Sequence, residues 1–225
     1  MPDKSSIWDK PLWTVLTKDL TCEFRSRQAL GSLGMFALIT LACVSMSLGG
    51  AVLEPQLAAA LLWVVLFFAA MAGLARSFVQ EQETGTLFTL RLYASAPAVF
   101  FGKLMFNLVL LMGLTAMILP LFVILLNVDV LLPEVLLLTV LLGNLGIGTV
   151  STLTAAMLTR AQGKGALFTV LTFPVLLPQF LSAVSVTTQA LNGAFTGYRE
   201  LLFMAGYDGL MLAAAMLLFD ILWQD

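Results

Sequence analysis

Residues 104–128 read LMFNLVLLMGLTAMILPLFVILLNV, a run of 25 residues without Asp, Glu, Lys or Arg. Four further runs share this property, at 28–53, 55–75, 135–159 and 165–198, with lengths of 26, 21, 25 and 34 residues. The hydrocarbon core of a bilayer is about 30 Å thick, so about 20 apolar residues of helix cross it. Each crossing is expected to be helical, because unpaired backbone is costly in lipid and no alternating strands suggest a barrel.

The composition of the 225 residues points the same way and excludes several classes of function. Apolar residues make up 60% of the chain and charged residues 11%, with a mean hydropathy of +0.99, whereas a soluble domain is about 25% charged. The sequence has no His, the commonest metal ligand. Its two cysteines, Cys22 and Cys43, are too few for a zinc site. The net charge of -2 carries no nucleic-acid signature. We therefore expect an integral membrane protein with no catalytic residues, no metal site and no nucleic-acid partner.

The apolar runs predict an all-α integral membrane fold with six transmembrane helices. These helices are expected near 30–53, 57–74, 104–126, 135–158, 166–186 and 205–223. Asp208 and Asp220 interrupt the last one, which we expect to span fully with one acid at each interface. The chain then divides into an N-terminal amphipathic interfacial helix at 1–29 and a six-helix domain at 30–225, whose cytoplasmic loop covers 76–103.

The N-terminal segment shows helical amphipathicity. Trp13, Leu16, Leu20 and Phe24 follow one another at steps of three and four, which places them on one face of a helix. Trp and Lys beside a membrane are typical of a helix that lies in the interface plane. One interpretation is a plain topological anchor, and the other is an elbow that packs beside a neighbouring subunit.

The basic residues indicate the orientation. With six spans, ten of the eleven Lys and Arg residues fall on one side, in the N-terminal segment and in the loops 75–103 and 159–165, and only Arg199 falls on the other. The positive-inside rule therefore places both termini in the cytoplasm.

The loop 76–103, RSFVQEQETGTLFTLRLYASAPAVFFGK, is the segment most suggestive of function. Gly85 tolerates the left-handed conformation that ends a helix, and Thr86 can cap a new short helix. Leu87 and Leu90 then share one face of that helix. This amphipathic surface favours docking to a cytoplasmic protein over packing on the chain's own helices. The residues of the candidate docking surface are Glu81, Glu83, Gly85, Thr86, Leu87, Leu90 and Arg91.

Within the first five spans Cys43 is the only ionisable side chain. These spans therefore lack the side chains that a proton relay or an intramembrane ion pair requires. Gly148, Thr152 and Ala156 recur at steps of four in the fourth span. They form a close-packing face for a helix of this chain or of a second copy.

Two prolines mark the fifth span. Pro174 and Pro178 each remove a backbone donor and are expected to bend the helix. A hinge that opens a lateral path at this kink is a hypothesis that follows from it.

The loop pattern Glu81-x-Glu83-x-Gly85-Thr86-Leu87-x-x-Leu90, followed by Ala98-Val99 and Lys103, resembles the cytoplasmic loop of ABC-type permeases. More narrowly, nearly the whole chain resembles the haem exporter protein B family (CcmB) of cytochrome c maturation. The further shared motifs are Asp19-Leu20-x-x-Glu23-x-Arg25, Glu54-Pro55-Gln56-Leu57, the Gly-rich stretch from Leu142-Gly143 to Gly148, Gly163-x-Gly165 and Pro174-x-x-x-Pro178.

This resemblance implies a permease of the bacterial inner membrane that dimerises and binds two copies of a separate ATP-binding cassette subunit. That subunit would hydrolyse ATP and receive the coupling helix at 86–93. A haem-handling membrane protein and a periplasmic haem chaperone would complete the complex. This chain would bind no cofactor itself, and without His any iron ligand from it would have to be Met, Cys or Tyr.

Two other classes of function compete with this one. A stand-alone secondary transporter or channel for a small apolar or amphipathic solute would need ion sites from broken helices, and only Pro174 and Pro178 hint at one. An integral membrane enzyme would need acid–base or metal chemistry, for which the sequence offers neither His nor a metal cluster.

Overall fold

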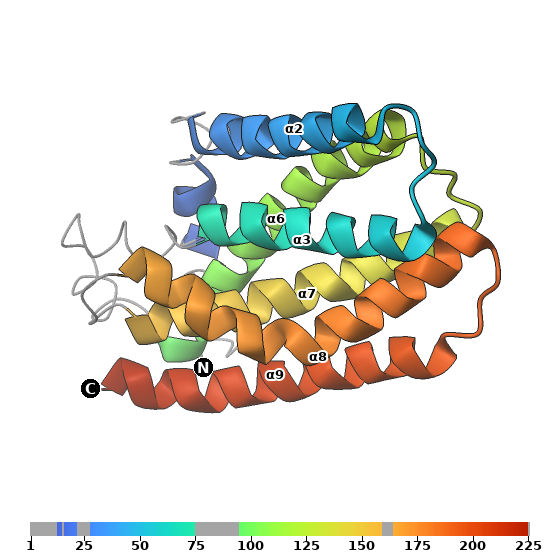
Figure 1. Ribbon diagram of the computed structural model, residues 1–225. Helices are drawn as coiled ribbons and strands as arrows, with labels where there is room; N and C mark the ends of the chain where they lie inside the picture. The colour runs from blue at the N-terminus through green and yellow to red at the C-terminus, as the bar shows by residue number, and fades with distance from the viewer. Residues whose placement is uncertain (1–12, 15, 22–27, 75–94, 159–163, 225) are drawn as a thin grey trace.

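The computed structural model describes residues 13–14, 16–21, 28–74, 95–158 and 164–224. Every regular element in these residues is helical, and six helices are long enough to build a bundle (Figure 1). They are α2 (Gln28–Leu48), α3 (Pro55–Leu74), α6 (Ala96–Leu126), α7 (Pro133–Met157), α8 (Lys164–Asn192) and α9 (Tyr198–Gln224). The expected all-α membrane fold is confirmed.

Local sequence explains where the helices begin and end. α2 stops at Leu48, five residues before the expected end, because Gly49 and Gly50 adopt positive φ angles of 56° and 88°. Ser95 occupies the N-cap of α6, and Pro133 is the first residue of α7, where its missing N–H costs no helical hydrogen bond. α6 begins eight residues earlier than expected and α9 begins seven residues earlier.

Five of these helices are long and apolar enough to cross a membrane, namely α3, α6, α7, α8 between Leu167 and Asn192, and α9 between Tyr198 and Phe219. In α2 the described apolar stretch is shorter, Leu33–Leu48, within a helix of 21 residues. Large apolar side chains such as Ile124, Leu181 and Leu217 point outward. An apolar exterior of this kind suits a bundle whose solvent is lipid.

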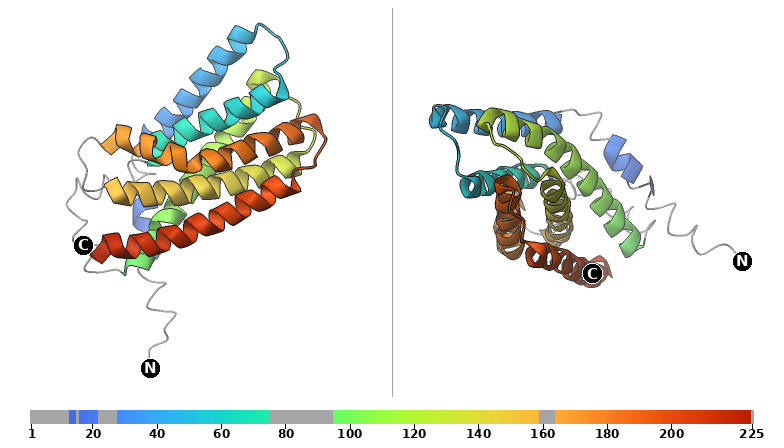
Figure 2. Two further views of the ribbon diagram at one scale, coloured as in Figure 1. Left: turned by 60° about the horizontal axis from the view of Figure 1, so that its bottom comes forward. Right: turned by 90° about the vertical axis from the view of Figure 1, so that its right-hand side faces the viewer.

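The helices pack around α7. This helix contacts α6, α8 and α9, while α3 lies between α2 and α8. Figure 2 shows the bundle end-on, with α2 and α6 toward one side and α8 and α9 toward the other. The connections at 49–54, 127–132 and 193–197 all lie at one end of the molecule (Figure 1). We call this the loop end.

A short helical segment within 13–21 lies against α6, close to where α6 begins. Leu16 is buried against Phe106 and Leu110, with Leu20 beside them. Trp13, expected on the same apolar stripe, is exposed, and Phe24 lies outside the described residues. This stripe therefore contacts α6 through its leucines.

An ion pair fixes the same segment. Lys103 on α6 lies with its Nζ atom 2.7 Å from Oδ2 of Asp19, and both side chains are at least nine-tenths buried. Asp19 belongs to the sequence motif at 19–25, and Lys103, expected at the end of the loop 76–103, is instead the eighth residue of α6. The contact thus joins the N-terminal segment to the helix that follows this loop.

Candidate functional site

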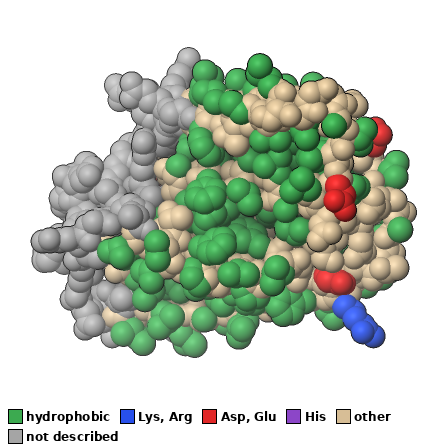
Figure 3. Space-filling view, viewed as in Figure 1, with side chains coloured by type: hydrophobic (Ala, Val, Ile, Leu, Met, Phe, Trp, Pro, Cys, Tyr) green, Lys and Arg blue, Asp and Glu red, His purple; other side chains and the backbone are tan. Residues whose placement is uncertain are grey.

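An apolar groove of about 630 Å³ lies between α3 and α8. Figure 3 looks onto this face, where hydrophobic side chains gather over the two helices. The groove opens outward, since Val64, Phe68 and Phe173 at its wall are about half exposed. Its volume falls in the range of about 300–1,000 Å³ that small-molecule sites occupy. Its lining residues are Gln56, Ala60, Trp63, Val64, Phe67, Phe68, Phe173, Leu177, Phe180, Leu181, Val184, Ser185, Thr188 and Gln189.

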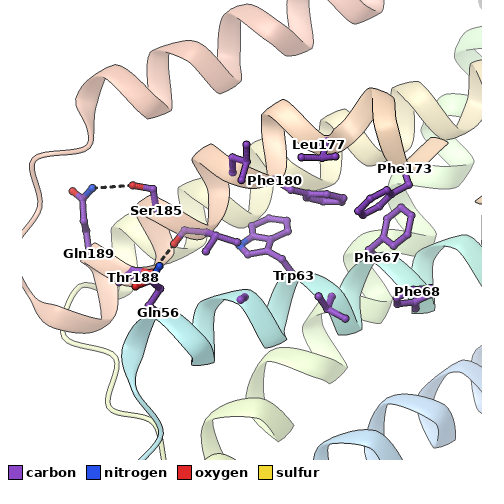
Figure 4. A pocket seen from close by; sticks show the side chains of 14 residues that line it. Gln56, Trp63, Phe67, Phe68, Phe173, Leu177, Phe180, Ser185, Thr188 and Gln189 are labelled. Carbon is purple, nitrogen blue, oxygen red and sulfur yellow. Dashed lines mark hydrogen bonds between the residues drawn. The ribbon is translucent and has the colours of Figure 1, made fainter. Parts of the chain in front are cut away.

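Aromatic rings form the inner wall of the groove. Phe67 on α3 contacts two rings of α8 edge-on, with centroids 5.4 Å from both Phe173 and Phe180. Trp63, one turn before Phe67, lies 6.0 Å from Phe180. Such edge-to-face pairs are stabilising beyond the area that they bury. The wall is therefore a layer of aromatic rings from α3 and α8 that pack against one another (Figure 4).

Trp63 is held from two sides. Its Nε1 atom donates a hydrogen bond to Oγ1 of Thr187 at 3.0 Å. Behind it, α7 passes so closely that a Cβ atom on Gly143 would lie 2.0 Å from Cη2 of the indole. Gly143 is therefore the residue that makes room for this ring, and Trp63 is 2% exposed.

The groove has a polar end and an apolar end. Gln56, Ser185, Thr188 and Gln189 lie toward the loop end, while the phenylalanines occupy the opposite part (Figure 4). Gln189 accepts a hydrogen bond from the backbone of Thr196 at 2.8 Å, which orders the α8–α9 connection. The arrangement suits a molecule with a large apolar body and a polar edge.

A polar cluster lies on the other side of α8. Asp208 on α9 is 2% exposed, and its Oδ1 atom accepts a hydrogen bond from Nε2 of Gln179 at 2.7 Å. Nε2 of Gln179 also donates to the carbonyl of Leu142 on α7 at 3.0 Å. A Cβ atom on Gly146 would lie 1.9 Å from Oε1 of Gln179, so the glycine leaves the space that this amide fills.

The expected position of Asp208 at a membrane interface is wrong. It is the eleventh residue of the 22-residue segment Tyr198–Phe219, because α9 begins at Tyr198 rather than near 205. At 1.5 Å per residue this lies about 15 Å along the helix, half the thickness of a bilayer core. The intramembrane region therefore contains an acidic group that the pattern of apolar runs did not predict.

The two prolines lie inside a continuous α8. Figures 1 and 2 show this helix changing direction about midway along its length. Between the prolines, the carbonyl of Val175 accepts a hydrogen bond from the Tyr207 hydroxyl. Gln179 follows Pro178 directly, so the polar cluster and the aromatic wall both meet α8 at this region.

The small-residue face of α7 is placed against α6 of the same chain. A Cβ atom on Gly148 would lie 3.0 Å from a methyl group of Leu108, and Oγ1 of Thr152 accepts a hydrogen bond from Nδ2 of Asn107 at 2.8 Å. Ala156 is buried one turn further on. Gly148 and Thr152 therefore pack against α6 of the same chain.

The candidate docking residues of the cytoplasmic loop, from Glu81 to Arg91, lie outside the described residues. The described helices on either side are α3, which ends at Leu74, and α6, which begins at Ala96. The loop therefore joins the helix that carries Trp63 and Phe67 to the helix that carries Lys103. Among the described residues no group of three or more His, Cys, Asp or Glu side chains is close enough to hold a metal ion.

The sequence did not lead us to predict the groove, although the spacing of its aromatic residues contains a signal for it. Trp63 and Phe67 are four residues apart, and Phe173 and Phe180 are seven apart, so each pair shares a helix face. In a chain where most exterior positions are apolar, such pairs do not stand out. Only the packing of α3 against α8 brings the two faces together.

These features define the class of protein: a polytopic helical membrane protein, with apolar helices long enough to span a bilayer and a groove that opens sideways. The family model described as CcmB protein matches residues 10–219, nearly the whole chain. The chain belongs to the CcmB family, the haem exporter subunits of cytochrome c maturation. A comparison with curated proteins finds no match.

Proposed function

We propose that this chain is the transmembrane permease subunit of an ABC transporter complex that exports haem or releases a haem chaperone in c-type cytochrome biogenesis. ATP is hydrolysed by a separate ATP-binding cassette subunit, and a second copy of the chain completes the core. The single observation that carries this proposal is the family match over residues 10–219. Further partners are a haem-handling membrane protein and a periplasmic haem chaperone.

The coupling segment is the loop 76–103, with its contacts made by Glu81, Glu83, Leu87 and neighbouring residues. Its position supports this role, because it directly follows α3, which forms one wall of the groove. A displacement of the loop is transmitted to Trp63 and Phe67 through one continuous helix. Closure of two ATPases then shifts the groove between two states, as in hinge-type transitions.

The location is the bacterial inner membrane, with both termini in the cytoplasm and the loop end in the periplasm. The distribution of Lys and Arg supports this orientation. A reporter fused after Leu132 is expected to be periplasmic, and a cytoplasmic signal at this position would contradict the orientation.

The groove is the surface that contacts the cargo. Haem is a flat aromatic macrocycle with polar carboxylates at one edge, which matches an aromatic wall that ends in amide and hydroxyl groups. No lining residue is a His, Cys, Met or Tyr, the residue types that ligate haem iron. Binding by ring contacts without iron ligation favours passage over retention.

Assembly with the ATPase gives the first test. Glu81→Lys, Glu83→Lys and Leu87→Asp are each expected to reduce co-purification with the ATP-binding cassette subunit at least about tenfold, because each removes a charge or apolar contact from the docked surface. Glu200→Lys, the same reversal at the start of α9, is the matched control. Retained assembly and ATP-dependent activity in all three loop variants would contradict the proposal. Solute uptake by liposomes that contain this chain alone would support a stand-alone transporter instead.

A groove-filling substitution gives the second test. Ala60→Phe is expected to weaken haem binding by the lipid-embedded complex about tenfold, because the added ring occupies the cavity; this corresponds to about 1.4 kcal/mol. The change in haem absorbance reports binding. Ala213→Phe introduces the same ring at an exposed position on α9 outside the groove and is expected to leave affinity unchanged. Equal affinities of the two variants would exclude the groove as the cargo site.

A further inference from the structure

A carboxyl group lies at mid-depth of the bundle, and the permease function described so far makes no use of it. Asp208 and Gln179 are 2% and 1% exposed. Each is central in its membrane segment, since Asp208 is the eleventh of 22 residues and Gln179 the thirteenth of 26. An ionisable side chain at this depth is rare and usually functional.

If Asp208 is ionised, this pair has more buried acceptor oxygens than hydrogen-bond donors to satisfy them. Gln179 Nε2 has two hydrogens, and they go to the Leu142 carbonyl at 3.0 Å and to Asp208 Oδ1 at 2.7 Å. This fixes the orientation of the amide and leaves Oε1 as an acceptor. Among the described residues, neither Gln179 Oε1 nor Asp208 Oδ2 has a hydrogen-bond partner. An ionised carboxylate only accepts, so both oxygens would be buried without a donor.

We propose that Asp208 is a proton-binding site, in which Oδ2 carries a proton and donates it to Oε1 of Gln179. The carboxylic acid and the amide then form a cyclic pair with one hydrogen bond in each direction. A single proton supplies a donor to one unpartnered oxygen and an acceptor to the other. It also removes a charge that would be costly at lipid depth.

The charged and titratable groups around Asp208 do not replace this proton. In the described residues, α6 carries only Lys103 and α7 only Glu134, both near the beginning of their helices, and α8 carries none between 167 and 192. On α9, Arg199 and Glu200 are in the first turn, and the Tyr207 hydroxyl donates to the carbonyl of Val175. Within this part of the chain no basic side chain is at mid-depth.

The proton links the state of Asp208 to the shape of the groove. The pair joins α9 and, through Leu142, α7 to α8 directly after Pro178. Leu177 and Phe180, on either side of this position, line the groove. Loss of the proton leaves a charge in the bundle and favours separation of α8 from α9, so that water reaches Asp208. We therefore expect the groove to respond to protonation of a residue that does not line it.

Infrared spectroscopy of the full chain in lipid membranes tests the proposal. At neutral pH the wild-type protein is expected to show the carbonyl band of a protonated carboxylic acid, and Asp208→Asn is expected to lose it. Asp129→Asn removes an exposed loop carboxyl and is the matched control. The same band in wild type and Asp208→Asn, or its absence from the wild type, would overturn the assignment.

A second measurement does not depend on how well one variant folds. If the folded state holds a proton that the unfolded state releases, raising the pH from neutral to alkaline lowers the melting temperature of the wild type. The acid band of the wild type is expected to convert to a carboxylate band over the same pH range. In Asp208→Asn the amide supplies a permanent donor, so this dependence is lost. An acid band that persists without loss of stability, or an equal slope in Asp208→Asn, would contradict the proposal.

Discussion

Gly143→Ala is expected to destabilise the protein by about 3 kcal/mol. The added methyl group would lie 2.0 Å from Cη2 and 2.4 Å from Cζ3 of Trp63. Movement of the indole into the groove would disrupt its packing on Phe180 and its hydrogen bond to Thr187. Overpacking costs about 1–3 kcal/mol and a lost hydrogen bond about 1 kcal/mol.

The measurement is equilibrium unfolding of the purified chain in detergent. Gly113→Ala is the matched control, since a Cβ atom at Gly113 on α6 meets nothing within 4 Å. The double variant Gly143→Ala with Trp63→Leu is expected to recover part of the loss, because the smaller side chain frees the space. Equal stabilities of the two alanine variants would show that Trp63 is not confined by α7.

Apolar runs predicted the helical membrane fold because lipid imposes a simple rule: every crossing needs about 20 apolar residues with internal hydrogen bonds. The rule does not predict where a helix ends inside an apolar run. Gly49 and Gly50 lie in such a run, and their positive φ angles end α2 there. The early start of α9 is a different case, because its first turn carries Arg199 and Glu200, and charge-free runs do not include such a turn.

The polar and aromatic sites were less predictable, because their partners are distant in sequence. Asp208 was expected at an interface because a charged residue usually marks the end of an apolar membrane-spanning run. Its partner Gln179 lies 29 residues away on another helix and satisfies it at depth. Trp63 and Thr187 are separated by 124 residues. Periodicity locates a face of a helix but not the helix that covers it, and this assignment comes from packing.

The buried ion pair between Asp19 and Lys103, at the end of the bundle opposite the loop end, gives the second large predicted effect on stability. Asp19→Ala is expected to lower stability by about 3 kcal/mol, because it removes the carboxylate at 2.7 Å from the buried ammonium of Lys103. Removing one partner of a buried ion pair typically costs about 3–5 kcal/mol, since the remaining charge loses the interaction that offset its desolvation. We take the lower limit because Asp19 retains a small exposed fraction.

Trypsin cleavage after Lys18 gives a local readout of this contact, in addition to unfolding in detergent. Lys18 is partly exposed beside Asp19, and cleavage there requires the segment to leave α6. Asp19→Ala is therefore expected to accelerate cleavage, whereas Asp129→Ala, which removes an exposed loop carboxylate, is not. Combining Asp19→Ala with Lys103→Met removes the buried charge that Asp19 pairs with while keeping the side-chain volume, so stability is expected to return toward that of the wild type. If the double variant is no more stable than Asp19→Ala, packing of Leu16 and Leu20, and not the ion pair, holds the N-terminal segment on the helix that follows the loop.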